Sequence, residues 1–324
     1  FLSFSCMFTC SRFIFGLNGD VHDNVVFADE ASLLYVAGHN LVIYNTLEKR
    51  QQFIPGSDDT EGITALAICP NKRYCAVAER SERAVVFIYD LRSLRKRKNL
   101  QFTDGSFREY VSMAFSYDNQ LLLTLGGAPD WTLICWDWTK ARAKCHAQAA
   151  EGFPLYHCSF SPLDATVAVA TGAGGLLKFF RVADQEMRAM PPPRGKAAHT
   201  YLCHAWLTQP EDHVLLGTEG GELVVFESGS FLTYLAAAPG EGHEVTALCA
   251  HGGGFVAGLS MGGFRMYAYA PEAPEAKDMF VVTQSWSLET PSRIQALALN
   301  PGEDLLAAAS EDRQLYTLSL AAAG

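Results

Sequence analysis

One unit of sequence recurs seven times along this chain, and it limits the possible folds more than any other feature. In each unit a short apolar strand, a turn rich in Pro, Asn, Asp or Gly, and two further apolar strands follow one another. Turn residues at these points predict that the chain reverses direction, so each unit is expected to be a β-meander. The units repeat at roughly 45 residues, the period of one four-stranded blade of a β-propeller. The first turns fall near Asp29, Pro70, Tyr117, Pro162, Pro210, Gly252 and Pro301.

The clearest unit covers residues 111–138, VSMAFSYDNQLLLTLGGAPDWTLICWDW. It contains Trp136-Asp137, the dipeptide that closes the third strand of a WD-repeat blade. In other units Tyr-Asp, Phe-Arg and Phe-Glu take the place of Trp-Asp. We expect the seven third strands at residues 41–45, 85–90, 132–137, 176–182, 222–227, 264–269 and 314–320.

One meander cannot bury both of its faces, whereas seven meanders packed around an axis can. We therefore predict an all-β fold, a seven-bladed WD-repeat β-propeller closed by an N-terminal strand. Residues 13–324 are expected to form this single domain, and residues 1–12 a ragged N-terminal segment. The seventh unit supplies three strands, and the spare apolar run Phe13–Leu17 is the expected fourth, which would remove an exposed edge. A continuation of the chain beyond Gly324 is the alternative source of that strand.

Composition narrows the choice of partners and of compartment. The formal net charge of −10 argues against a general binder of nucleic acid or of anionic membranes, because both need a basic face. No apolar run reaches the roughly 18 residues that a membrane-spanning helix needs. Nine cysteines, most of them within expected strands, are typical of buried thiols in a reducing cytoplasm.

Several residues match positions that stabilise WD-repeat blades. In a well-formed repeat, a His before the first strand, an Asp in the second turn and the Trp share buried hydrogen bonds. Here Trp136, Asp137 and Asp130 stand in the third unit, Asp312 in the seventh and His243 in the sixth. No unit has the whole set, so these residues are structural candidates and the blades are expected to depend mainly on apolar packing.

A dense basic cluster follows the third strand of the second unit. It consists of Arg92, Arg95, Lys96, Arg97 and Lys98. One interpretation is a solvated outer strand, which is what most charge runs form. The other is a contact for an acidic partner such as a tubulin tail.

The sequence offers little support for catalysis or for a bound cofactor. Gly258–Gly262 matches the nucleophile-elbow pattern at Ser260, but an expected strand follows it where the pattern needs a helix. His157-Cys158 and Cys203-His204 are strand neighbours that point to opposite faces, so neither pair can hold a metal together. The first strands, which would line the central channel, are mostly small and apolar. We therefore expect no catalytic, cofactor-binding or metal-binding residue, no small-molecule substrate, and no enzyme.

Beyond the repeat, seven short strings occur in a specific order. They are FGL (15–17), FIPGS (53–57), CPNKRY (69–74), RKRK (95–98), SMAFS (112–116), SFSP (159–162) and GT with FESG (217–229). Together they resemble the N-terminal region of the family of cilia- and flagella-associated protein 57, WD-repeat proteins of the axoneme. In that family two propellers precede a long coiled coil, so this chain would correspond to the first propeller.

The resemblance implies a non-catalytic adaptor in the axoneme of a motile cilium or flagellum. It implies a role in placing inner dynein arms and regulatory complexes on doublet microtubules, with axonemal proteins, including subunits of these assemblies and tubulin, as partners. It assigns no site residue by residue. A propeller subunit of another assembly, such as an intraflagellar-transport or vesicle-coat complex, is the alternative, because many functions share this fold.

Overall fold

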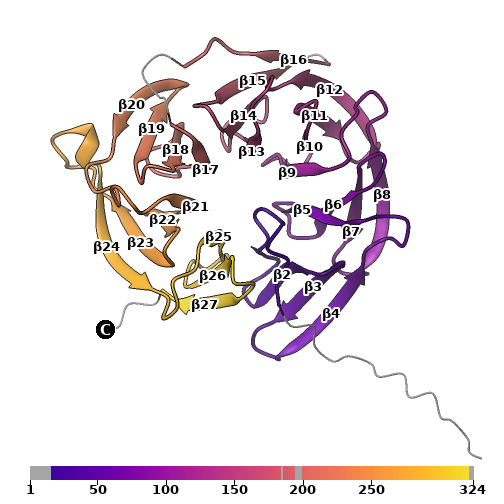
Figure 1. The fold of residues 1–324 in the computed structure, drawn as a ribbon, viewed down its shortest axis with the longest axis horizontal. Coiled ribbons are helices and arrows are strands. Elements are labelled where there is room, and N and C mark those ends of the chain that lie inside the picture. Colours follow the sequence, from indigo (N-terminus) through magenta and orange to yellow (C-terminus); the bar gives the residue numbers. More distant parts are fainter. Residues whose placement is uncertain (1–15, 184, 194–198, 321–324) are drawn as a thin grey trace, which may run out of the picture.

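The computed structural model describes residues 16–183, 185–193 and 199–320. These residues form seven antiparallel sheets arranged as blades around a common axis (Figure 1). The prediction of an all-β, seven-bladed propeller is confirmed. Within the described ranges, no helix has the length and apolar character needed to cross a membrane.

The blades follow one another in chain order. Blade one contains β1 (Val26–Phe27), β2 (Ser32–Ala37), β3 (Asn40–Asn45) and β4 (Arg50–Pro55). Blade two contains β5 (Gly62–Ile68), β6 (Tyr74–Arg80), β7 (Val85–Asp90) and β8 (Arg95–Gln101). Blade three contains β9 (Tyr110–Phe115), β10 (Leu121–Gly126), β11 (Thr132–Asp137) and β12 (Arg142–Gln148). Blade four contains β13 (Leu155–Phe160), β14 (Val167–Gly172), β15 (Leu177–Ala183) and β16 (Glu186–Ala189).

The remaining three blades complete the ring. Blade five contains β17 (Tyr201–Trp206), β18 (His213–Thr218), β19 (Leu223–Glu227) and β20 (Ser230–Tyr234). Blade six contains β21 (Val245–His251), β22 (Gly254–Leu259), β23 (Gly263–Tyr269), the 3-10 helix η1 (Ala276–Asp278) and β24 (Phe280–Ser287). Blade seven contains β25 (Ile294–Leu299), β26 (Leu305–Ser310) and β27 (Leu315–Ser319).

Every sheet is a simple meander in which strands adjacent in sequence pair with each other. The expected third strands are found as β3, β7, β11, β15, β19, β23 and β27, within one or two residues at each end. Residues 133–136 of β11 are all buried, which a strand covered on one face alone would not allow. The middle strands are therefore covered on both faces, each by a different neighbouring blade.

The core consists of apolar layers between adjacent blades, and β7 shows how they arise. Ile88 packs with Leu122 and Ile134 in the layer between blades two and three. Phe87, the next residue along the strand, packs with Leu34 in the layer between blades one and two. Since side chains alternate along a strand, each blade contributes one face to each of two layers. Among the described residues, seven such layers connect the blades around the whole ring.

The layer between blades one and seven closes the ring. Leu33 and Tyr35 of blade one pack there with Ala296 and Ala307 of blade seven. Glu30 strengthens the same seam, since its carboxylate accepts hydrogen bonds from Asn300 Nδ2 at 2.9 Å and Gly302 N at 3.0 Å. Blades one and seven are thus joined by side-chain packing and loop hydrogen bonds.

The expected closing strand Phe13–Leu17 is only partly within the described residues. Gly16 and Leu17 belong to no strand, so for these two residues the prediction is wrong. Leu17 is 4% exposed and packs into the seam between blades one and seven. Residues 13–15, like the predicted segment 1–12, lie outside the described ranges, so a closing strand there stays a prediction.

We predict that the closing seam contributes strongly to stability. Leu33→Ala removes a fully buried side chain and leaves a cavity, which should cost about 3 kcal/mol of unfolding free energy. Leu47→Ala is the matched control, because Leu47 is 81% exposed, and it should change stability by less than about 0.5 kcal/mol. Chemical denaturation followed by tryptophan fluorescence measures both changes. Similar, small effects would show that the seam does not hold the ring.

Candidate functional site

Trp136, the tryptophan of the Trp-Asp dipeptide, is buried in the third blade and forms a hydrogen bond through its indole N–H. Its indole is 1% exposed, and Nε1 donates to Thr124 Oγ1 at 2.9 Å across the β10–β11 pair. Phe102 meets the ring edge-on, with centroids 6.4 Å apart. Because a buried N–H needs a partner, Thr124 makes it possible to bury this large side chain. The partner of Trp136 is thus a threonine, and the structural role expected of Trp136 stays a prediction.

Two aspartates of the same blade hold turns. Asp137 Oδ1 accepts from the Lys140 backbone N–H at 3.2 Å, and its Oδ2 accepts from Lys140 Nζ at 2.7 Å. The Lys140 side chain and further hydrogen bonds lower the pKa of Asp137. Asp130 Oδ2 accepts from Ser106 N at 2.5 Å, which ties the β10–β11 turn to the connection that enters the blade. Both carboxylates stabilise the local backbone.

The other two WD-type candidates lie in different blades. Asp312 is in the exposed turn between β26 and β27, where its N–H donates to Ser292 Oγ at 3.1 Å and its carboxylate accepts from Tyr316 OH at 3.3 Å. His243 precedes β21 as expected, but its side chain is exposed. The structure therefore brings Trp136, Asp137 and Asp130 into one blade and leaves Asp312 and His243 in others.

The bond between Trp136 and Thr124 gives a prediction. Thr124→Val removes the acceptor while keeping the shape, so the buried indole N–H loses its partner at a cost of about 1–3 kcal/mol. The double variant with Trp136→Phe should then cost less than the sum of the two single changes. Denaturant unfolding of the four proteins measures the coupling. Strictly additive costs would mean that the hydrogen bond contributes nothing.

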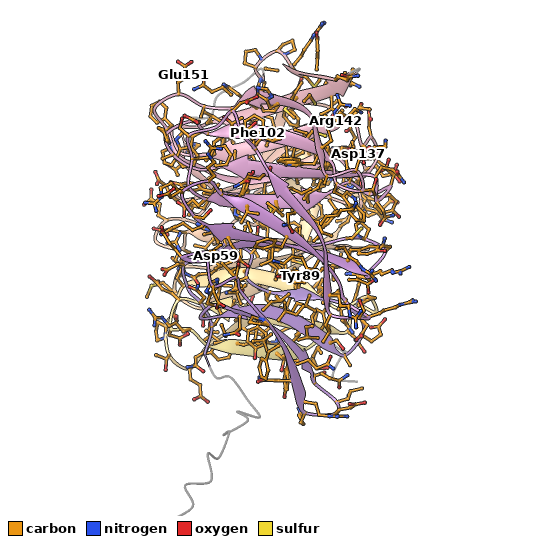
Figure 2. The ribbon with its side chains drawn as sticks, turned by 90° about the vertical axis from the view of Figure 1, so that its right-hand side faces the viewer. Asp59, Tyr89, Phe102, Asp137, Arg142 and Glu151 are labelled. Carbon is orange, nitrogen blue, oxygen red and sulfur yellow. The ribbon has the colours of Figure 1, made fainter. Side chains whose placement is uncertain are left out.

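The basic cluster of the sequence lies on the circumference of the ring, as predicted for an outer strand. Four of its residues belong to β8 and Arg92 lies in the turn before it. Figure 2 views the molecule from the side on which β8 lies, with the rims of blades two and three toward the reader. All five basic side chains are exposed, and Leu100 is the one buried residue of β8.

Two of the five cations already have partners inside the blade. Asp90 ends β7 with a side chain only 2% exposed, and its Oδ2 accepts from Arg97 Nη2 at 3.1 Å and from Arg73 Nη2 at 3.4 Å. Although burial alone would raise it, hydrogen bonds from Ser93 N and Arg97 lower the pKa of Asp90 to about 2. Lys96 forms a cation–π contact instead, with its Nζ 3.6 Å from the centroid of the Phe87 ring.

The other three cations have no such partner. Arg92, Arg95 and Lys98 form no ion pair with any described residue. Within the predicted cluster, Arg97 and Lys96 therefore contact other groups of the blade, whereas the remaining three cations are not neutralised by a described residue. We call Arg92, Arg95 and Lys98 the β8 patch.

A second group of polar side chains lies at the middle of the ring, where the sequence led us to expect small apolar ones. The segment ahead of β1 turns in toward the axis (Figure 1). Gln295 Nε2 of blade seven donates to Gly19 O at 3.0 Å, and His22 forms an isolated parallel bridge with Ala65 of blade two. This segment therefore contacts first strands on both sides of blade one.

Asp23 connects this segment to the opposite part of the ring. Its Oδ2 lies 3.0 Å from Nδ1 of His157 on β13 in blade four. Burial would lower the pKa of His157, but the charge of Asp23 and their hydrogen bond raise it above its ordinary value. The pKa of Asp23 is lowered despite burial, chiefly by His157. The side chain of Asp23 is 52% exposed, so solvent screening weakens this ion pair.

His204 of β17 completes the group. Its Nε2 lies 2.7 Å from Ser159 Oγ and its Nδ1 lies 2.8 Å from Thr171 Oγ1. Burial and the neighbouring His157 lower its pKa to about 3, so the ring is neutral and both nitrogens are satisfied by hydroxyls. Trp206 Nε1 donates to Ser159 Oγ at 3.0 Å, which occupies the serine as well.

The expectation of an apolar channel lining is therefore wrong at β13 and β17. As predicted for strand neighbours, His157 and Cys158 face opposite ways, since Cys158 Sγ donates to Ser112 O of blade three at 3.6 Å while His157 Nδ1 pairs with Asp23 at the axis. The sequence could have indicated the two histidines, which stand in first strands, but no periodicity predicts that the irregular segment brings Asp23 to them. No three His, Cys, Asp or Glu side chains of the described ranges are grouped to hold a metal. Ser260 lies between β22 and β23, so a strand follows it and the elbow pattern is not realised.

The ion pair between Asp23 and His157 predicts a pH-dependent stability. Because the pKa of His157 is raised in the folded protein, the protonated imidazole stabilises the fold at pH values below its ordinary pKa of 6.5. This stabilisation is lost as the pH rises through the pKa of the folded state. Because the pKa of Asp23 is lowered, its carboxylate stabilises the fold at pH values above its ordinary pKa of 3.8. This stabilisation is lost as the pH falls through the pKa of the folded state. Asp23→Asn should therefore lower the melting temperature more at pH 5.5 than at pH 9.

Asp20→Asn is the matched control, since Asp20 is an exposed carboxylate of the same segment, and its effect should not depend on pH in this way. Differential scanning calorimetry at both pH values gives the comparison. Equal losses for Asp23→Asn at pH 5.5 and pH 9 would show that the ion pair does not join the segment to blade four.

No family model matches the chain, but several curated proteins are similar to it in sequence. The chain is 40% identical to cilia- and flagella-associated protein 57 of Mus musculus over 220 residues, which cover 67% of this chain and 17% of that protein. It is 22% identical to cilia- and flagella-associated protein 57 C of Tetrahymena thermophila over 95% of this chain and 29% of that protein. It is 28% identical to cilia- and flagella-associated protein 44 of Mus musculus over 66% of this chain and 11% of that protein. The chain thus spans less than a third of each of these relatives.

Solved structures support the fold alone. A chain in a crystal structure of the mitotic checkpoint complex superposes with a TM-score of 0.73, covering 95% of this chain and 93% of that one, at 13% identity. The β-propeller domain of Cps50 (Swd1) from Myceliophteria thermophila superposes with a TM-score of 0.66, covering 82% and 84%, at 14% identity. At these identities the likeness is one of architecture.

Proposed function

The chain is a homologue of cilia- and flagella-associated protein 57, and on this premise we propose that it is a non-catalytic scaffold of the ciliary or flagellar axoneme. The observation that carries the proposal is the 40% identity to the mouse protein over two thirds of the chain. Further relatives named for cilia and flagella, among them protein 44 of Chlamydomonas reinhardtii, support the same placement. The family resemblance noted in the sequence agrees with these relatives.

The more specific part of the proposal is mechanical. The propeller helps to position inner dynein arms and regulatory complexes on doublet microtubules, with subunits of these assemblies and tubulin as partners. Its continuous apolar layers make a stiff ring whose turns and outer strands are free for contacts. The polar side chains at the axis support a non-catalytic scaffold, because His204 and Ser159 are already hydrogen-bonded to other protein groups.

The proposal predicts where the protein is found and what depends on it. In ciliated cells that express a tagged full-length protein, the tag should remain with axonemes after detergent and salt extraction. Loss of the protein should reduce inner dynein arm heavy chains and slow the beat, while outer dynein arm chains serve as the control. Recovery of the tag with a soluble transport complex or with vesicle coats would contradict the axonemal placement. Unchanged inner arms would contradict the positioning role.

A further inference from the structure

The β8 patch is a concentration of free positive charge on an acidic protein. No Asp or Glu occurs between Asp90 and Asp104, whereas the whole chain has a formal net charge of −10. Asp90 Oδ1 accepts from the backbone N–H groups of Arg92 and Ser93 at 3.0 and 3.1 Å, so the turn that carries Arg92 is held in place. The charges are therefore presented by a fixed hairpin.

The backbone beneath these charges is also available. β8 is the last strand of its sheet and hydrogen-bonds to β7 along one edge. In the part of the chain that the structure describes, no strand pairs with its other edge. Unpaired N–H and C=O groups along a free edge accept an added strand. The seven residues Arg95–Gln101 extend over roughly 23 Å at about 3.3 Å per residue, enough for a short extended segment.

We propose that the β8 patch binds an acidic, extended segment of a partner protein, which lies along the free edge of β8 with its carboxylates against Arg92, Arg95 and Lys98. The edge supplies hydrogen bonds that do not depend on sequence, and the three cations select for acidic side chains. The proposal deepens the scaffold role and rests on it for its biological setting. Peptide binding itself is measured on the isolated propeller.

A short peptide fits this surface better than a large polyanion does. A nucleic acid or an anionic membrane needs an extended basic face, which a protein with a formal net charge of −10 and three unpaired cations at this site does not offer. An extended segment of six or seven residues, at about 3.3 Å per residue, is no longer than β8 and stays on this surface. Arg97 and Lys96 are excluded from the binding set because Asp90 and Phe87 already occupy them.

The test uses a fluorescently labelled peptide of eight glutamates and fluorescence anisotropy at low and high salt. The patch variant Arg92→Gln, Arg95→Gln, Lys98→Gln should weaken binding about tenfold, the expectation for three exposed ion pairs. The control variant Lys49→Gln, Arg142→Gln, Arg313→Gln removes the same charge from exposed residues in blades one, three and seven and should change binding less than about twofold by the same reasoning. Both variants should keep the wild-type melting temperature, since none of the six forms a described ion pair.

Three outcomes would overturn the proposal. Equal loss in the two variants would show attraction to net charge rather than to the patch. Tighter binding of an eight-residue single-stranded DNA than of the peptide would favour nucleic acid. A patch variant that associates with itself in sedimentation experiments but binds the peptide normally would show that the cations only guard a free edge. Each outcome concerns the patch alone, so a failure here leaves the axonemal placement to be judged by cell fractionation.

Discussion

The structure depends on one constraint, which is that each sheet has two apolar faces and each face is covered by a different neighbour. Ile88 faces blade three while Phe87 faces blade one, although they are adjacent in β7. A buried aliphatic or aromatic side chain contributes roughly 1.5–3 kcal/mol relative to an exposed one. An isolated blade would leave the side chains of both faces in water, so the blades are stable only as a set. The set has no uncovered blade face only when the ring is closed.

Closure determines where function can be. The apolar residues are committed to the layers between blades, and His204 and Ser159 at the axis are hydrogen-bonded to other protein groups. The turns and the outer strands remain for contacts with other molecules. Among the outer strands, β8 combines a free edge with three cations that no described residue neutralises. A scaffold role and a contact on the circumference are therefore consistent with the same physical arrangement.

The sequence predicted most of the architecture because alternation and turn residues encode it directly. The third strand at 132–137 was expected with the same bounds as β11. The assignment of Leu17 to a strand was wrong, because an apolar residue at a chain end packs into a seam as readily as it joins a sheet. The contact between Asp23 and His157 was not predicted, since it joins an irregular segment to a distant blade.

For the basic cluster too, the sequence predicted one property and missed another. Its position on an outer strand followed from the repeat, but the commitment of Arg97 to Asp90 did not. That ion pair depends on the register of the β7–β8 hairpin, which shifts between Ile88 and Tyr89. A change of one residue in that register would alter which cations are free, and composition carries no such information.

Native-state hydrogen exchange measures most directly whether the seven blades are stable as one closed set. The informative amides are those of the second strands, because these lie inside every blade: β2 in blade one, β26 in blade seven and β10 in blade three. If the layers between blades hold the ring, these strands should exchange with similar free energies, close to that of global unfolding. Much faster exchange of β2 and β26 than of β10 would mean that the ring opens at the seam between blades one and seven, and that packing between blades does not close it.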